Sequence, residues 1–187
     1  MRALAITLTL VAASSGSAQQ TTPAIAPRPP DQAAGQALMM CVAHSLGMVP
    51  ITASDAEALA EGGLIYSEQY PPFLKSAAQN GFGKGSFAQS PSTDGQVWAV
   101  GYDSGACMVM AIGTPDGPVA QRFEQLFAIP NTWKREKIKQ LPGARWSQYG
   151  WKTSKANLVA QMSVSDLPPG SPAKGAVQVT ISRKVGK

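Results

Sequence analysis

Residues 157–165, NLVAQMSVS, and residues 176–184, AVQVTISRK, each alternate apolar and polar side chains. A period of two is typical of a β-strand that buries one face and leaves the other in solvent. The apolar positions are Leu158, Ala160, Met162 and Val164 in the first stretch and Val177, Val179 and Ile181 in the second. The two stretches therefore predict strands of a sheet that is covered on one face.

Two further pairs of strands are expected upstream, each with a short turn sequence inside it. Residues 133–140 and 145–152 lie on either side of Pro142-Gly143, which suits the centre of a type II turn. Residues 97–102 and 107–112 flank a loop rich in Asp, Ser and Gly, which is a hairpin signal.

Helical patterns precede and separate these strands. Apolar residues recur at intervals of three and four after Asp31, a residue suited to an N-cap. Ser54 to Glu57 has the spacing of a capping box, and Pro115-Asp116 places a proline and an acid in a first turn. The predicted helices span residues 32–46, 54–61, 73–78 and 115–128.

The order of these elements predicts an α+β fold, in which an antiparallel sheet has helices packed on one face. N-terminal helices come first, followed by a hairpin, one helix and a C-terminal meander. Two copies of a helix-plus-strands unit, one built on residues 32–46 and one on residues 115–128, are an alternative description. No repeated motif in the sequence supports it.

The N-terminal residues resemble an export signal. Residues 1–18 contain a single basic residue, Arg2, an apolar run and then small residues before Gln19, which is the layout of a cleavable signal peptide. Residues 19–33 hold four prolines and little to bury, so a flexible segment is expected there. The remainder, residues 34–187, has the length of a single domain. We therefore expect a periplasmic or secreted protein without a transmembrane segment after signal cleavage.

The chain contains two cysteines, Cys41 and Cys107, and so allows one intramolecular disulfide. Export favours the disulfide, because exported proteins leave the reducing cytosol. The alternative is a pair of buried free thiols that do not meet.

Charge is divided unevenly along the chain. Residues 19–130 contain four Lys or Arg against nine Asp or Glu, whereas residues 131–187 contain eleven against two. Such a polarised molecule can orient itself on an anionic surface or on a second protein.

Much of the basic charge lies in the hairpin over residues 133–152. If Leu141 faces Ala144, Lys139 lies opposite Trp146 and Trp133 opposite Lys152. Arg135 and Lys137 are then expected on that same face, and Ile138, Tyr149 and Trp151 on the face that packs on the core. The candidate binding residues are Trp133, Arg135, Lys137, Lys139, Trp146 and Lys152. A solvated strand face, with lysine stems lying over tryptophans, is the other interpretation.

Catalytic motifs are lacking in the sequence. There is no Gly-x-Ser-x-Gly pattern, and His44 is the single histidine, so no catalytic residue, metal site or cofactor is predicted. The leading hypothesis is a non-enzymatic envelope protein that contacts an anionic polymer or another exported protein. Nucleic acid is not an expected partner. The alternatives are a small extracytoplasmic hydrolase that uses carboxylates and an inhibitor or chaperone-like binder of another exported protein.

Overall fold

The computed structural model describes residues 25–114, 116–165 and 175–184. Four α-helices and two short 3₁₀ helices accompany the strands over these residues. The helices are α1 (Pro30–Ser45), η1 (Ala53–Asp55), α2 (Ala56–Glu61), η2 (Pro72–Leu74), α3 (Lys75–Ala78) and α4 (Asp116–Phe127). The strands are β1 (Ile65–Ser67), β2 (Gln79–Asn80), β3 (Gly83–Ser90), β4 (Gln96–Tyr102), β5 (Cys107–Thr114), β6 (Lys134–Leu141), β7 (Ala144–Lys152), β8 (Asn157–Ser165) and β9 (Gly175–Arg183).

The strands form one antiparallel sheet in the order β1-β3-β4-β5-β9-β8-β7-β6, and β2 pairs with β3 beside it. In both halves of the sheet the strands follow one another in chain order from the edge to the centre. The half that follows α1 runs β1, β3, β4, β5, and the half that follows α4 runs β6, β7, β8, β9. The last strands of the two runs, β5 and β9, pair at the centre of the sheet. The α+β prediction is confirmed, and the connectivity repeats as the two-unit description requires.

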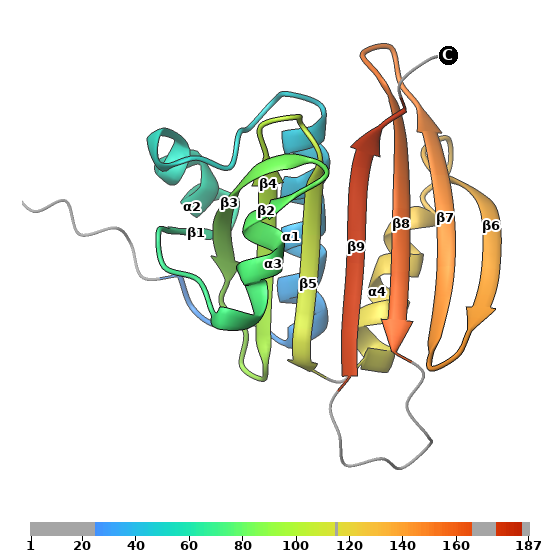
Figure 1. Cartoon of the computed structure of the whole chain (residues 1–187), viewed down its shortest axis with the longest axis horizontal. Coiled ribbons are helices and arrows are strands. Elements are labelled where there is room, and N and C mark those ends of the chain that lie inside the picture. Colours follow the sequence, from blue (N-terminus) through green and yellow to red (C-terminus); the bar gives the residue numbers. More distant parts are fainter. Residues whose placement is uncertain (1–24, 115, 166–174, 185–187) are drawn as a thin grey trace, which may run out of the picture.

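The two long helices lie on the same side of the sheet and touch one another, behind the strands in Figure 1. Their apolar side chains pack on alternate residues of the strands, as the period of two predicts. The helices approach closely at Gly35, where a Cβ atom would lie 3.0 Å from Nε of Arg122. The resulting core includes Leu38, Phe123, Val109 and Val179, all fully buried.

The opposite side of the sheet is covered over one half. Leu74 and Ala77, in η2 and α3, pack on Phe87, Trp98 and other apolar side chains of β3–β5. Figure 1 shows α3 in front of these strands, whereas no described helix lies in front of β6–β9. The helix layer expected on one face is therefore joined by a smaller layer on the other, over the N-terminal half alone.

Cys41 in α1 and Cys107 in β5 form a disulfide with a Cα–Cα distance of 5.3 Å. Both residues are fully buried, and the bond joins the helix layer to the centre of the sheet. The predicted pairing is confirmed. No described helix is long and apolar enough to cross a membrane.

Two predictions about helix N-termini need correction. Helix α1 begins at Pro30, so Asp31 lies in its first turn and is not the N-cap. Asp55 precedes α2 without a side-chain cap, because its carboxylate accepts hydrogen bonds from Thr52 and Ser54; the capping box is absent.

Residues 28–33 do not belong to the flexible segment predicted for residues 19–33. Arg28 is fixed by two backbone hydrogen bonds, to Pro91 and from Thr93, and α1 starts two residues later. Residues 19–24 and the predicted signal peptide, residues 1–18, lie outside the described residues.

Candidate binding face of the C-terminal strands

The β6–β7 hairpin has the predicted register at its turn end. Leu141 faces Ala144, and Lys139 faces Trp146. The ammonium nitrogen of Lys139 lies 5.8 Å from the centroid of the Trp146 ring, within the range of a cation–π contact. Lys137 faces Gln148 two residues further on, so it shares this side of the hairpin.

A β-bulge at Glu136 then changes which side chains share a face. Arg135 pairs with Tyr149 and Lys137 with Gln148, which leaves Glu136 as the extra residue. Because strand side chains alternate, one inserted residue moves everything before it to the opposite face. This bulge is the physical reason for two wrong assignments, those of Arg135 and Trp133.

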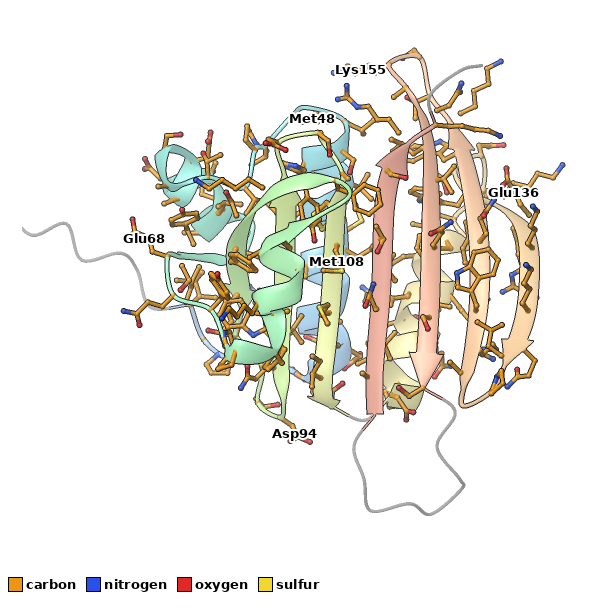
Figure 2. All side chains as sticks on the ribbon, in the orientation of Figure 1. Met48, Glu68, Asp94, Met108, Glu136 and Lys155 are labelled. Carbon is orange, nitrogen blue, oxygen red and sulfur yellow. A yellow bond between two sulfur atoms is a disulfide. The ribbon has the colours of Figure 1, made fainter. Side chains whose placement is uncertain are left out.

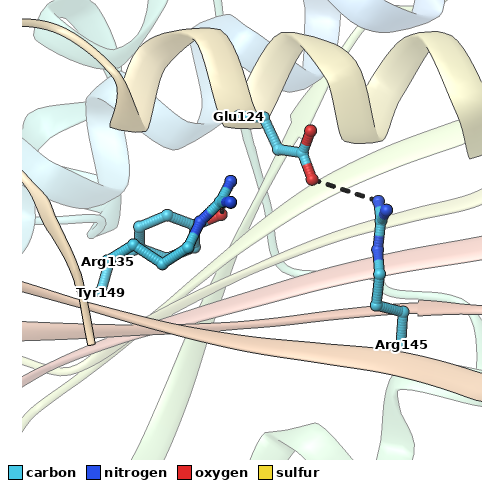
Figure 3. A network of polar contacts seen from close by, with 4 residues as sticks. All are labelled: Glu124, Arg135, Arg145 and Tyr149. Atoms are coloured by element: carbon cyan, nitrogen blue, oxygen red, sulfur yellow. Dashed lines mark hydrogen bonds and ion pairs between the residues drawn. The ribbon is translucent and has the colours of Figure 1, made fainter. Parts of the chain in front are cut away.

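Arg135 lies on the helix side of the sheet. Its guanidinium donates to the Tyr149 hydroxyl at 3.4 Å, and its Cζ atom lies 5.5 Å from the ring centroid. Figure 3 shows the two side chains one over the other. Tyr149 is 2% exposed and stacks on Phe127 of α4 with 4.4 Å between ring centroids. Arg135 therefore covers the margin of the core and does not belong to the predicted basic face.

Trp133 also faces the helix layer. Its ring lies 5.3 Å from that of Phe127 and 5.3 Å from that of Trp151, so it packs at the core and not opposite Lys152. Tyr149 and Trp151 pack there as predicted. Ile138 does not pack on the core as predicted. It points to the helix side but is 56% exposed, and every other residue of β6 is exposed as well.

The same side of β7 carries a surface ion pair. Arg145 donates to a carboxylate oxygen of Glu124 in α4 at 3.1 Å, and both side chains remain partly exposed (Figure 3). Arg145 therefore ties the hairpin to α4, and Arg135 lies over Tyr149 within the hairpin, which leaves the lysines as the cations on the other side.

The bulge brings other residues to that other side. Lys134 takes the position opposite Gly150, and Glu136 accepts a hydrogen bond of 2.7 Å from Gln148. Glu136 leans over Gly150, where a Cβ atom would collide with its carboxylate. We call the exposed Lys134, Lys137, Lys139 and Lys152, together with the half-buried Trp146, the lysine face. The sequence analysis missed Lys134 and Glu136, since no residue pattern marks a bulge here.

A shallow hollow of about 870 Å³ adjoins the lysine face where β6 begins. Three lysines line it, Lys134, Lys152 and Lys184, with the single carboxylate of Glu136 among them. The hollow therefore extends the cationic character of the face toward the end of β9.

Polar side chains continue from the lysine face across the sheet. The register places one row over Lys139, Trp146, Ser163 and Gln178. A second row runs parallel to it over Lys137, Gln148, Gln161 and Thr180. Both rows reach β5 at Met110 and Met108, where the apolar cluster beneath α3 begins. In Figure 2 the strands carrying these rows lie between the labelled Glu136 and Met108.

His44 is engaged with the backbone. Its Nδ1 accepts a hydrogen bond from the amide of Ile51 at 3.1 Å, so Nε2 carries the proton and donates to the Tyr102 carbonyl at 3.0 Å. Burial lowers the pKa of His44. Neither ring nitrogen is free to act as a general base or metal ligand, and no group of three His, Cys, Asp or Glu side chains among the described residues is placed to hold a metal ion.

Comparison of the chain with models of protein families, with curated proteins and with solved structures finds no match.

Proposed function

We propose that this protein is an exported, non-enzymatic binding module of the cell envelope, and that its lysine face contacts an anionic partner. The observation that carries the proposal is the joint position of Lys137, Lys139 and Trp146. All three lie on one side of the edge hairpin, away from α1 and α4, and no described residue is packed over them as a second layer.

The arrangement supports recognition of negative charge. The sheet half formed by β6–β9 contains most of the basic residues that the structure describes. Glu136, the one carboxylate that these residues place on this face, is already bonded to Gln148. An anion approaching the face therefore meets several mobile ammonium groups and an aromatic ring. Such contacts are exposed, so each contributes modestly and weakens with salt.

Export is supported by two features. The buried Cys41–Cys107 disulfide is of a kind that persists in oxidising compartments, and the residues before it have the layout of a cleavable signal peptide. A periplasmic or secreted location is therefore part of the proposal.

The test is salt-dependent binding to two kinds of polyanion, polyglutamate and uronic-acid polysaccharides, measured by fluorescence anisotropy. The variant Lys137→Glu/Lys139→Glu is compared with Lys75→Glu/Lys155→Glu, which changes the net charge equally at exposed sites outside the lysine face. We expect the first variant to bind about tenfold or more weakly at low salt, since each exposed charge contact contributes roughly 0.2–1 kcal/mol and reversal adds repulsion. Equal weakening by both variants, or by neither, contradicts the proposal.

A further inference from the structure

We infer that the ligand of the lysine face is a linear acidic polysaccharide, which lies across strands β6–β9 along the two polar rows. This inference rests on the proposed function and names the class of its anionic partner.

The first argument is the kind of side chain in the rows. On the side of β8 and β9 that faces away from α1 and α4, no charged residue occurs between the strand ends. Amides and hydroxyls stand there instead: Gln161, Ser163, Gln178 and Thr180. Each of these groups both donates and accepts hydrogen bonds, as sugar hydroxyls do. Removing water from a neutral polar group also costs less free energy than removing it from a charged group.

The second argument is the order of the groups along each row. Ammonium groups lie at the β6 end of both rows, Trp146 follows on β7 in one row and Gln148 in the other, and neutral polar groups occupy β8 and β9. A carboxylate-bearing sugar needs a cation for its charge, an aromatic plane for the apolar face of its ring and amides for its hydroxyls. The lysine face and the rows supply these three contacts side by side.

The third argument is spacing. Neighbouring strands lie about 4.8 Å apart, so successive side chains of one row are separated by about the length of a pyranose unit. A polymer perpendicular to the strands therefore meets a new side chain at each sugar. Four strands carry the rows before the apolar cluster at Met108 and Met110, which fits a segment of about four sugars.

The face suits a polysaccharide better than a folded protein or a membrane. Protein interfaces usually have an apolar centre, and peripheral membrane proteins insert apolar side chains. Here the centre of the face is occupied by Gln148, Gln161 and Ser163, and the large exposed aliphatic Leu141 lies at the turn, on its margin.

The experiment compares polygalacturonate, alginate and hyaluronate with polyglutamate, at equal concentration of carboxylate. We expect at least one polysaccharide to bind tenfold or more tightly than polyglutamate. The double variant Gln161→Ala/Gln178→Ala should weaken polysaccharide binding at least fivefold and leave polyglutamate binding within twofold. Trp146→Ala should also weaken polysaccharide binding at least fivefold. Gln121→Ala/Gln125→Ala, on the exposed side of α4, is the matched control and should change neither.

The outcomes separate the inference from the proposed function. If all polyanions bind equally and the glutamine variants have no effect, while Lys137→Glu/Lys139→Glu abolishes binding, the polysaccharide assignment is overturned and the charge-based function stands. If polyglutamate binds more tightly than every polysaccharide, an acidic protein is the better partner and the inference fails. If none of the polyanions binds, the proposed function fails with it.

Discussion

Nε2 of His44 lies 3.0 Å from the carbonyl oxygen of Tyr102, and with Nδ1 bonded to the Ile51 amide the imidazole joins the end of α1 to β4 and to the loop after the helix. Protonation of Nδ1 would place two donors against each other. Burial holds the pKa of His44 below its ordinary value of 6.5. The backbone hydrogen bonds raise this pKa in part, and the nearby charge of Arg183 lowers it further.

This arrangement predicts lower stability in mild acid. Below pH 6.5 the unfolded chain binds a proton at His44 that the folded protein does not, so the free energy of unfolding falls as the pH falls, until the folded pKa is reached. The slope from one such group is at most about 1.4 kcal/mol per pH unit. Urea unfolding at pH 7.5 and 5.5 measures it.

His44→Asn is the control for that measurement, because its amide oxygen keeps an acceptor near the Ile51 amide but does not titrate in this range. Wild type and His44→Asn should converge in stability as the pH falls. Equal losses in the two proteins would show that another group is responsible.

The disulfide should contribute a large share of the stability. Cys41 and Cys107 close a loop of 66 residues, for which the chain-entropy model gives about 4 kcal/mol. We expect Cys41→Ala/Cys107→Ala to unfold at correspondingly lower denaturant concentration. A reductant should lower the denaturant midpoint of the wild type and leave that of the variant unchanged. A variant whose free energy of unfolding lies within about 1 kcal/mol of the wild-type value would contradict the prediction.

Deletion of Glu136 should test the bulge. A regular β6 would turn the residues before the deletion to the opposite face, which removes Trp133 from Phe127 and Trp151. The lost burial of a large apolar side chain costs roughly 1.5–3 kcal/mol. Unfolding curves and the wavelength of tryptophan emission measure the two effects.

Glu136→Ala keeps the residue count, so the bulge should remain and the tryptophan emission should not shift. A deletion variant as stable as Glu136→Ala would mean that Trp133 keeps its place without the bulge.

Strand positions were predictable because alternation is a local signal. Leu158, Ala160, Met162 and Val164 face the helices as their alternation indicates. The two-residue turn at Pro142-Gly143 was enough to pair Lys139 with Trp146. Gly143 has a φ of 71°, which its missing Cβ permits. The disulfide followed from the presence of just two cysteines and an export-like N-terminus.

What the sequence did not reveal depends on contacts between distant elements. The bulge at Glu136 has no marker in its own strand; its one trace is Gly150, fourteen residues later, which leaves space for the carboxylate. The layer formed by η2 and α3 was equally hidden. Leu74 could have packed on either side of the sheet, and the choice depends on Phe87 and Trp98.

The central position of β9 has a consequence for the order of folding. This strand comes after every strand it joins: its partners are β5, more than sixty residues earlier, and β8. Until residues 175–183 arrive, the two halves of the sheet cannot be closed into one, and contacts that span so much chain form slowly. In a polypeptide that emerges N-terminus first, the two halves of the sheet would therefore stay unjoined until β9 is delivered. The topology thus makes the junction between β5 and β9 a late contact of this sheet in any chain that is delivered from its N-terminus.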